Sequence, residues 1–530
     1  MKYNLIFAFF VGFAAYLHAA WQYNSTDYTA TDGTWTLKFV PSSNSDSLIL
    51  GAKSADNKSW LAGGAVISGS GALDLSSFQS DTGVEISTIG DNAFQNVAIT
   101  ELTAPGVVEI KDYAFKQNTV LTSLNCPNVV KIGQQAFNGA TALASVSIST
   151  DVYELGNYVF KGTTSLTDFS VKTFNALETI GEGLFNGSAI TGKFSFPSVK
   201  TIKRSAFSGC TNVTELEFPA VVSIEGSAFS GTTSLQKLVW SENLTSVGSL
   251  VFYPNCAVKT LIPTVFPKLG SVSSQTFSGA KNLEGDFEFP LLTSLPQNFF
   301  NGCNSINSIK ATAVTKINDN QAFRNCTSLT SAIFSPSLEV IGNQAFQGCT
   351  SLAHFEPYLP DTLTRLGSSA FEGCTALTTP PRIAAPGLTA ISGTAFNTTA
   401  SMWTTAVDIY SPISSIGAQG FWPCVSGQVF NFYADVAPVP LVKNAIICST
   451  RKDKSDGMAV LRVKSSKALP VWLNDCAGNA DVFATLSASR DDVPEGRVVG
   501  VVMVLNGSNQ KKYHWVVDDT PPDGSVICIM

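Results

Sequence analysis

The hexapeptide Ile-Gly-Gln-Gln-Ala-Phe at residues 132–137 returns later in the chain as Ile-Gly-Asn-Gln-Ala-Phe at residues 341–346. Looser copies of the hexapeptide run through most of the sequence at intervals of 21 to 25 residues. A fixed period of this length is typical of a repeat protein, in which each unit packs against its two neighbours. Fifteen copies end in a phenylalanine that we expect to lie in the core: Phe94, Phe115, Phe137, Phe160, Phe185, Phe207, Phe229, Phe252, Phe277, Phe300, Phe323, Phe346, Phe371, Phe396 and Phe421.

The residues after each hexapeptide predict a short β-strand. In one copy Leu216 and Phe218 alternate with Glu215 and Glu217, and Pro219 then ends the strand. One unit buries too little apolar surface to be stable alone, so neighbouring units must stack with their strands in parallel, roughly 4.8 Å apart. The sequence therefore predicts a solenoid of stacked parallel β-strands. The hexapeptide would turn its Ile, Ala and Phe inward, and short turns or helical turns would form the other face.

The repeat unit resembles the leucine-rich repeat of the BspA-like type, also called the Treponema pallidum type, over roughly residues 85–425. Some copies depart from the pattern: Leu184 replaces the alanine, Pro296 replaces the glycine, and residues 317–323 contain one extra residue. We expect these departures to change the local curvature and not the fold. The resemblance implies a secreted or surface protein, often an adhesin or host-interaction protein, without catalytic activity.

The composition argues against several functions. Charged residues make up 14% of the chain and the net charge is -7 with no long basic run, which disfavours binding to nucleic-acid phosphates. The sequence has three histidines and lacks the P-loop, G-x-S-x-G, H-E-x-x-H and EF-hand patterns. We therefore expect no enzyme activity, no cofactor, no metal site and no nucleic-acid partner.

The N-terminus has the layout of a secretory signal peptide. Lys2 precedes a nearly unbroken apolar stretch at residues 5–17, and the small Ala19 and Ala20 follow it. We expect residues 1–20 to be removed on export, which would leave no membrane-inserted segment. An uncleaved membrane anchor is the alternative, although the stretch is shorter than the ~20 residues of a typical span.

The segments that flank the repeats have their own patterns. We assign residues 21–84 to an N-terminal β cap over the first exposed core face, with an independent domain as the alternative. Residues 85–425 form the solenoid of about fifteen repeats. Residues 426–530 are expected to form a C-terminal cap and a small β module. Within that module, residues 497–505 and 512–517 predict a hairpin, because the turn dipeptide Asn-Gly lies between them.

Eleven cysteines occur, and six of them follow a repeat phenylalanine by three residues. A disulfide ladder or metal site is one reading, since an exported protein meets an oxidising compartment. No C-x-x-C pair occurs, and equivalent Cβ vectors on adjacent coils run parallel, which disfavours zinc and disulfides. A disulfide among Cys448, Cys476 and Cys528 is left open. Four cysteines in successive repeats are expected to be buried, reduced and stacked: Cys303, Cys326, Cys349 and Cys374.

The outward positions of the predicted strands form the candidate binding site. Strand alternation turns these side chains away from the core, and stacking joins them into one face. That part of the face is mostly acidic, so we expect it to favour basic partners and to bind less well in salt. A merely solvated sheet that binds nothing is the alternative. The candidate residues are Glu215, Glu217, Asp286, Glu288, His354 and Glu356.

Two classes of function follow from this reading. The first is an exported, non-catalytic module, secreted or at the cell surface, that binds an extracellular or surface protein or serves adhesion. The second is a structural spacer of the cell envelope without a specific ligand. A glycan-processing enzyme would need paired carboxylates, such as Glu215 with Glu217 or Asp286 with Glu288, inside a pocket. We expect these pairs on an open sheet, which disfavours the enzyme.

Overall fold

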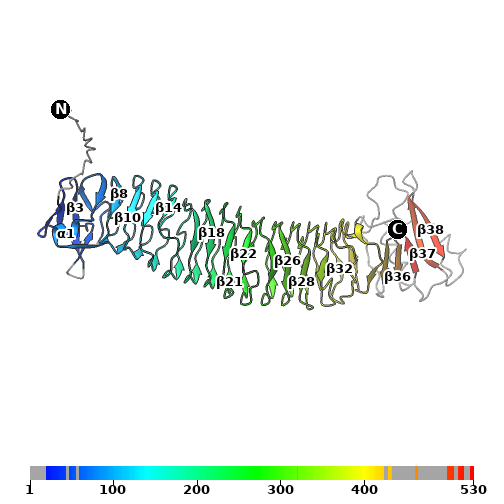
Figure 1. Cartoon of the computed structure of the whole chain (residues 1–530). Coiled ribbons are helices and arrows are strands. Elements are labelled where there is room, and N and C mark those ends of the chain that lie inside the picture. The colour runs from blue at the N-terminus through cyan, green and yellow to red at the C-terminus, as the bar shows by residue number, and fades with distance from the viewer. Residues whose placement is uncertain are drawn as a thin grey trace, which may run out of the picture. The chain divides into compact units, whose positions relative to one another are not determined.

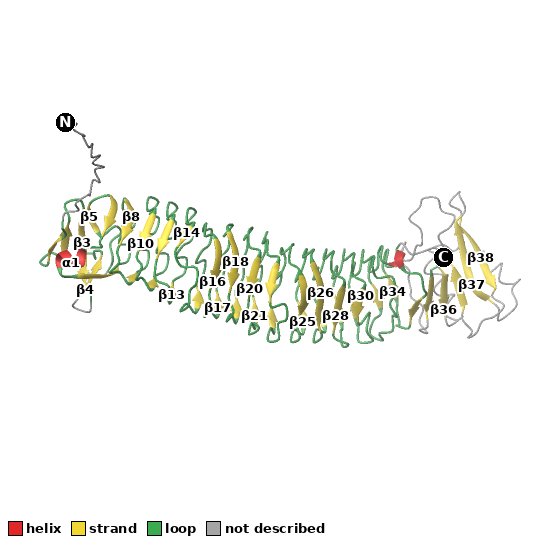
Figure 2. Ribbon diagram, viewed as in Figure 1, coloured by secondary structure: helices red, strands yellow, loops and turns green. Residues whose placement is uncertain are grey.

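The computed structural model describes residues 20–42, 47–54, 59–318, 320–422, 428–432, 460–463, 498–505, 511–517 and 526–529. The chain divides into two compact units, Met1–Val171 and Lys172–Met530. In each unit the backbone winds as a parallel β-solenoid whose strands lie side by side as successive rungs (Figure 1). The described residues contain two short helices, α1 (Phe78–Thr82) and η1 (Ala400–Met402), drawn in red in Figure 2.

Each coil of the solenoid contributes strands to two parallel ladders. Ladder A contains the predicted strands that follow the hexapeptide. Apart from its first strand, which has five residues, ladder B contains two-residue strands that end at the first, apolar residue of the hexapeptide, where Ile132 lies opposite Ile110 and Leu155. The sequence predicted ladder A but only turns on the other face. Ladder B forms there because backbone N–H groups reach the preceding coil, as Gly133 N–H does when it donates to the Ile110 carbonyl at 2.7 Å.

In the unit Met1–Val171, ladders A and B each form one sheet. Ladder A consists of β6 (Gly71–Asp74), β8 (Ile99–Thr103), β10 (Ser123–Asn125), β12 (Ser145–Ser147) and β14 (Asp168–Phe169). Ladder B consists of β7 (Glu85–Ile89), β9 (Glu109–Ile110), β11 (Lys131–Ile132) and β13 (Glu154–Leu155). The parallel pairing of ladder A starts at Gly71, which lies within the segment predicted as an N-terminal cap.

Antiparallel strands precede the solenoid in this unit and join ladder B directly, because β4 pairs parallel with β7. Trp35 is buried among them, and its indole N–H donates to the Ala72 carbonyl at 2.8 Å. This hydrogen bond ties the antiparallel strands to the first strand of ladder A. The strands are β1 (Gln22–Asn24), β2 (Thr29–Thr31), β3 (Thr36–Pro41), β4 (Ser47–Leu50) and β5 (Val66–Ser68).

In the unit Lys172–Met530, ladder A forms two four-stranded sheets. The first is β16 (Gly192–Ser195), β18 (Val213–Glu217), β20 (Lys237–Val239) and β22 (Thr260–Ile262). The second is β24 (Gly285–Glu288), β26 (Ile306–Ala311), β28 (Ser331–Phe334) and β30 (His354–Glu356). Ladder B comprises β15 (Thr179–Ile180), β17 (Thr201–Ile202), β19 (Ser223–Ile224), β21 (Ser246–Val247), β23 (Ser271–Val272), β25 (Ser294–Leu295), β27 (Lys316–Ile317), β29 (Val340–Ile341), β31 (Arg365–Leu366), β32 (Ala390–Ile391) and β34 (Ser415–Ile416).

The last described strands form one six-stranded sheet that extends ladder A and then turns antiparallel. The predicted hairpin is confirmed, since Leu505 lies opposite Lys511 and Val498 opposite Val517. The predicted Asn-Gly turn and the residues around Cys448 and Cys476 lie outside the described residues. The strands are β33 (Val407–Ile409), β35 (Val429–Phe432), β36 (Val460–Val463), β39 (Val526–Ile529), β37 (Val498–Leu505) and β38 (Lys511–Val517).

The repeat phenylalanines stack in a column in each unit. Phe137 lies between Phe115 and Phe160, with ring centroids 5.0 and 5.5 Å away and nearly parallel planes. From Phe185 to Phe421, successive rings are 4.5 to 6.0 Å apart. All fifteen phenylalanine rings are fully buried, so the column forms a continuous part of the hydrophobic core in each unit. Stacked pairs of this kind add about 0.5–1.5 kcal/mol each beyond the area they bury.

At Gly133 and Gly248 the glycine of the hexapeptide is required by close packing of the coils. A Cβ on Gly133 would lie 2.6 Å from the Asp112 backbone nitrogen, and one on Gly248 would lie 2.6 Å from the Gly226 nitrogen. Atoms do not approach this closely without displacing the backbone, so a side chain here would push adjacent coils apart. The Ile-Gly pair therefore combines an inward anchor with a point of direct backbone contact.

The residue two positions before each repeat phenylalanine has a left-handed backbone. The φ angle at this position lies between 54 and 67° in all fifteen copies, although only one of them, Gly183, is glycine. The conformation aims its N–H at the next coil, as when Gln135 donates to the Asn157 carbonyl at 2.8 Å. This column of strained residues carries the chain around the edge from ladder B to the phenylalanine column.

Among the described residues, the cysteines at the third position after the repeat phenylalanine are buried free thiols. Each thiol donates to the carbonyl of a phenylalanine one coil earlier. Cys326 Sγ, for example, lies 3.2 Å from the Phe300 carbonyl oxygen, which also accepts the Cys303 N–H at 3.0 Å. Thr399 makes the same bond to Phe371 through its hydroxyl. Cysteine and threonine can both supply this donor, whereas other coils place a small residue without a side-chain donor there, such as Ala140 and Ala280.

Candidate binding surface

The six candidate residues lie on ladder A of the unit Lys172–Met530 and point away from the core. They come in pairs from β18, β24 and β30, and each pair flanks a buried side chain: Leu216, Phe287 or Phe355. Strand alternation thus places them where the sequence predicted. The structure brings the members of each pair together, but five strands separate β18 from β30 along the ladder, so the six do not form one cluster.

Two outward columns run along the first sheet of this face. One column places Glu215 between Lys193 and Lys237, and the other places Glu217 beside Val239. The parallel register fixes these neighbours, since equivalent residues of adjacent coils lie directly opposite each other. Contacts between side chains about 22 residues apart in sequence follow from this register and cannot be read from one repeat alone.

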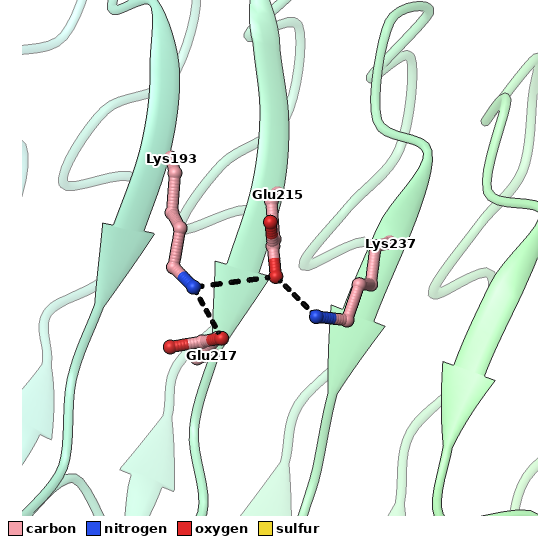
Figure 3. A network of polar contacts seen from close by, with 4 residues as sticks. All are labelled: Lys193, Glu215, Glu217 and Lys237. Atoms are coloured by element: carbon pink, nitrogen blue, oxygen red, sulfur yellow. Dashed lines mark hydrogen bonds and ion pairs between the residues drawn. The ribbon is translucent and has the colours of Figure 1, made fainter.

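The carboxylates of β18 are held by lysines from both neighbouring strands (Figure 3). Glu215 Oε1 lies 2.5 Å from Lys237 Nζ and 3.4 Å from Lys193 Nζ. Lys193 Nζ also lies 2.6 Å from Glu217 Oε1. The hydrogen bond from Lys237 is the main cause that lowers the pKa of Glu215, and the hydrogen bond to Glu217 is the main cause that raises the pKa of Lys193.

The other two pairs are also partnered. Glu288 Oε1 lies 2.8 Å from Lys310 Nζ, and Asp286 Oδ1 accepts a hydrogen bond from the Ser308 hydroxyl at 2.6 Å. His354 Nε2 lies 3.4 Å from Glu356 Oε1 on the same strand. The face was expected to be mostly acidic, but lysines on adjacent coils pair with its glutamates. Its charges alternate in sign, and the four residues in Figure 3 have no net formal charge.

Three apolar residues lie between the charged groups, the half-buried Val239 and the exposed Ile262 and Val265, and we call them the apolar centre. Val239 lies opposite Ile262 across β20 and β22. Ile262 and Val265 expose 44% and 43% of their surface, and Val265 pairs with Glu288 of the next sheet. The apolar centre thus continues the outer column from Glu217 to Glu288.

The candidate residues predicted from the sequence include none of these three. The coil that contains Ile262 and Val265 is 25 residues long, and Pro263 interrupts the strand pattern immediately after Ile262. The isolated bridge from Val265 to Glu288 restores the pairing beyond that interruption. A proline inside the strand pattern was a signal of irregular pairing that could have pointed to this coil.

The described residues hold no group of three or more His, Cys, Asp or Glu side chains arranged to bind a metal ion. In the described part of the chain, no helix is long and apolar enough to cross a membrane. What the surface does offer is a rigid strand face with paired charges around an apolar centre. That arrangement suits contact with another macromolecule better than it suits acid–base chemistry.

The coils and their two ladders define a repeat protein of the leucine-rich-repeat class. The family described as BspA type Leucine rich repeat region matches residues 87–214, 178–307, 255–378 and 355–438. These overlapping matches cover residues 87–438 without a gap, which is more than half of the chain. The chain belongs to this family of BspA type leucine-rich-repeat proteins. No enzyme family is indicated by the match.

Solved structures of bacterial leucine-rich-repeat proteins are similar to this chain. A leucine-rich repeat protein from Bacteroides ovatus is 23% identical, over 64% of this chain and 91% of that one, with a TM-score of 0.44. A leucine rich cell surface protein from Faecalibacterium prausnitzii is 17% identical, over 73% and 90%, with a TM-score of 0.33. The leucine rich repeat protein of T. pallidum is 14% identical, over 60% and 87%, with a TM-score of 0.17. No curated protein matches the chain.

Proposed function

We propose that this chain is a non-catalytic protein-binding or adhesion module that is secreted or held at the cell surface. The proposed partner is an extracellular or surface protein that docks on ladder A over the apolar centre. The observation that supports the proposal is the exposure of Ile262 and Val265 between two sets of lysine–glutamate pairs. An apolar centre with a charged rim is the usual anatomy of a protein interface.

The physical properties of the face suit recognition. β-Branched side chains such as Val239, Ile262 and Val265 have few rotamers, so these side chains lose little conformational entropy when a partner buries them. β20 is paired on both sides, β22 pairs with β20, and the isolated bridge from Val265 to Glu288 holds the same coil from the other side, which lowers the cost of ordering the surface. The preformed pairs at Lys193 and Lys310 add orientation and electrostatic complementarity, which contribute more to specificity and association rate than to affinity.

The envelope spacer is less consistent with these residues. A spacer that binds nothing gains no advantage from exposed apolar side chains at the middle of a charged face, where they invite nonspecific association. A glycan-processing enzyme is also poorly supported. A general acid needs a raised pKa, but Lys237 lowers the pKa of Glu215, and an open strand face gives no enclosed cleft.

Export is part of the proposal and rests on the N-terminal sequence. The pattern predicted as a signal peptide at residues 1–20 falls almost entirely outside the described residues. The similar protein from Faecalibacterium prausnitzii is a leucine rich cell surface protein. N-terminal sequencing of the protein recovered from the culture medium or envelope tests this part. Recovery of an N-terminus after Ala19 or Ala20 would support it, and recovery only inside the cell would contradict it.

The binding experiment compares matched surface variants. The chain from residue 21 onward is immobilised and exposed to purified extracellular-matrix proteins and to envelope proteins. The variant I262E/V265E should lose a protein that the parent retains. The control V222E/L291E introduces the same charges at exposed apolar residues of the same unit outside ladder A, and it should retain that protein. Equal retention by both variants, or no retained protein with the parent, would contradict the proposed function.

A further inference from the structure

A cavity of about 370 Å³ lies in the unit Met1–Val171, whereas the surface described above belongs to the unit Lys172–Met530. It is formed where α1 and β7 meet the turn that precedes β9. Its walls combine apolar side chains, Leu75, Phe78 and Val108 among them, with the polar Gln79 and Glu85. The volume is at the low end of the range for small-ligand sites, and mixed walls of this kind suit a side chain with an apolar stem and a polar end.

Glu85 is the charged residue of this cavity. It is half-buried at the start of β7, and no ion pair or side-chain hydrogen bond of its carboxylate occurs among the described residues. By contrast, the nearby Asp81 accepts hydrogen bonds from the Trp21 N–H and the Ser77 hydroxyl. A carboxylate at a partly apolar wall is stabilised by a cation that replaces part of its lost hydration.

The surface beside the cavity is also acidic and partly apolar. Lys131 Nζ lies 3.5 Å from Glu109 Oε1 and 3.4 Å from Glu154 Oε2, so a single lysine forms ion pairs with two glutamates along ladder B. Val108 is exposed at the cavity, and an apolar stripe leads from it through Val130 to Tyr153, because their backbones pair in that order. A basic and apolar chain segment would therefore be complementary to the cavity and the surface that continues from it.

We propose that this cavity receives an arginine side chain of a partner protein. The methylene stem would lie against Leu75 and Val108, and the guanidinium would bind the Glu85 carboxylate. A planar guanidinium can donate two parallel hydrogen bonds to one carboxylate, which a lysine ammonium cannot. Apolar residues that flank the arginine would lie on the stripe toward Tyr153. The proposal rests on the proposed function in taking the ligand to be a protein, and it adds a second, chemically defined contact.

The test uses three blocked tripeptides that differ only in the middle residue: acetyl-Ala-Arg-Ala-amide, the lysine peptide and the glutamine peptide. Calorimetric titration of the chain from residue 21 onward should give saturable, millimolar binding of the arginine peptide, at least tenfold tighter than the glutamine peptide. E85Q should weaken binding of the arginine peptide at least tenfold, and so should Q79K, which places a cation at the exposed rim. E178Q, at an exposed ion pair with Lys200 in the other unit, should leave binding unchanged.

The outcomes separate this proposal from the proposed function. Equal binding of the arginine and glutamine peptides, or unchanged binding in both E85Q and Q79K, would overturn the cavity proposal. Equal binding of the lysine peptide would overturn the choice of arginine. Thermal unfolding of each variant checks that the fold is retained, and Q79K keeps the test valid if E85Q unfolds. Arginine-peptide binding with no retained partner protein would support the cavity site while the protein-binding function fails.

Discussion

The thiol of Cys326 illustrates how single residues connect neighbouring coils. It lies in the core and donates to the Phe300 carbonyl one coil away. Burial is the main cause that raises its pKa well above the ordinary value for cysteine. A thiol that stays protonated and shielded from solvent is a poor nucleophile, so these cysteines are structural donors and not reactive groups.

Thiol labelling checks this assignment. Cys303, Cys326, Cys349 and Cys374 should remain unmodified by a maleimide at pH 8 in the native protein, and all four should react after denaturation. The expected difference follows from complete burial and a raised pKa at Cys326 and Cys374. Rapid native labelling, or mass loss consistent with disulfides between successive coils, would show that the thiols are exposed or oxidised.

Substitution of Cys326 tests the hydrogen bond itself. Cys326→Ala removes a donor and leaves a small cavity, and the free energy of unfolding should fall by about 1–2 kcal/mol. Cys326→Thr should cost less, because Thr399 makes the equivalent bond in this chain. Urea unfolding compares the two. The donor role would be excluded if threonine destabilised the protein as much as alanine does.

The left-handed column gives a stabilising prediction. Ser205 has a φ of 54°, which costs about 1–2 kcal/mol for a residue with a Cβ. Ser205→Gly should therefore raise the free energy of unfolding by up to about 1 kcal/mol, after the greater flexibility of glycine in the unfolded chain is subtracted. Ser208→Gly, three residues on and without a positive φ, should lower it. If thermal unfolding showed that Ser208→Gly stabilises the protein and Ser205→Gly destabilises it, backbone strain at Ser205 would be contradicted.

At the scale of elements, the phenylalanine column and ladder B differ in how far the sequence predicts them. Residues such as Phe137 and Phe346 recur in register, so their burial follows from the repeat. Ladder B and the left-handed position do not follow from the repeat, because glutamine and serine, as at Gln135 and Ser205, are not residue types that indicate a positive φ. Backbone pairing between coils forces that conformation. The Lys193–Glu217 contact also depends on register, which spacing within one repeat does not specify.

Loss of one ring should weaken the column on both sides. Phe137→Ala removes stacking with Phe115 and Phe160 and opens a core cavity, so the local free energy of unfolding should fall by about 3–5 kcal/mol. Hydrogen exchange of the adjacent strand amides measures this loss. Val120 is exposed, so Val120→Ala serves as a control and should change the local free energy of unfolding by less than ~0.5 kcal/mol. Unchanged protection in Phe137→Ala would contradict the column as a continuous part of the core.

At the scale of the whole molecule, repetition explains both the stability and the proposed use of the chain. Each coil repeats the same inward residues, while its outward residues are free to differ. Most coils present polar side chains on ladder A, whereas the coil with Ile262 and Val265 presents apolar ones. The sequence predicted the face but not this centre, because Pro263 breaks the strand pattern there and shifts the pairing to Val265.

Site-specific photo-crosslinking tests the central claim that a partner protein docks over the apolar centre. A benzophenone amino acid is placed at Ile262 in one variant and at Val222 in another, two exposed apolar sites of the same unit. After illumination with extracellular and envelope proteins, the Ile262 variant should form a discrete crosslinked product that the Val222 variant does not form. No product at Ile262, or the same product in equal amount from Val222, would contradict the claim.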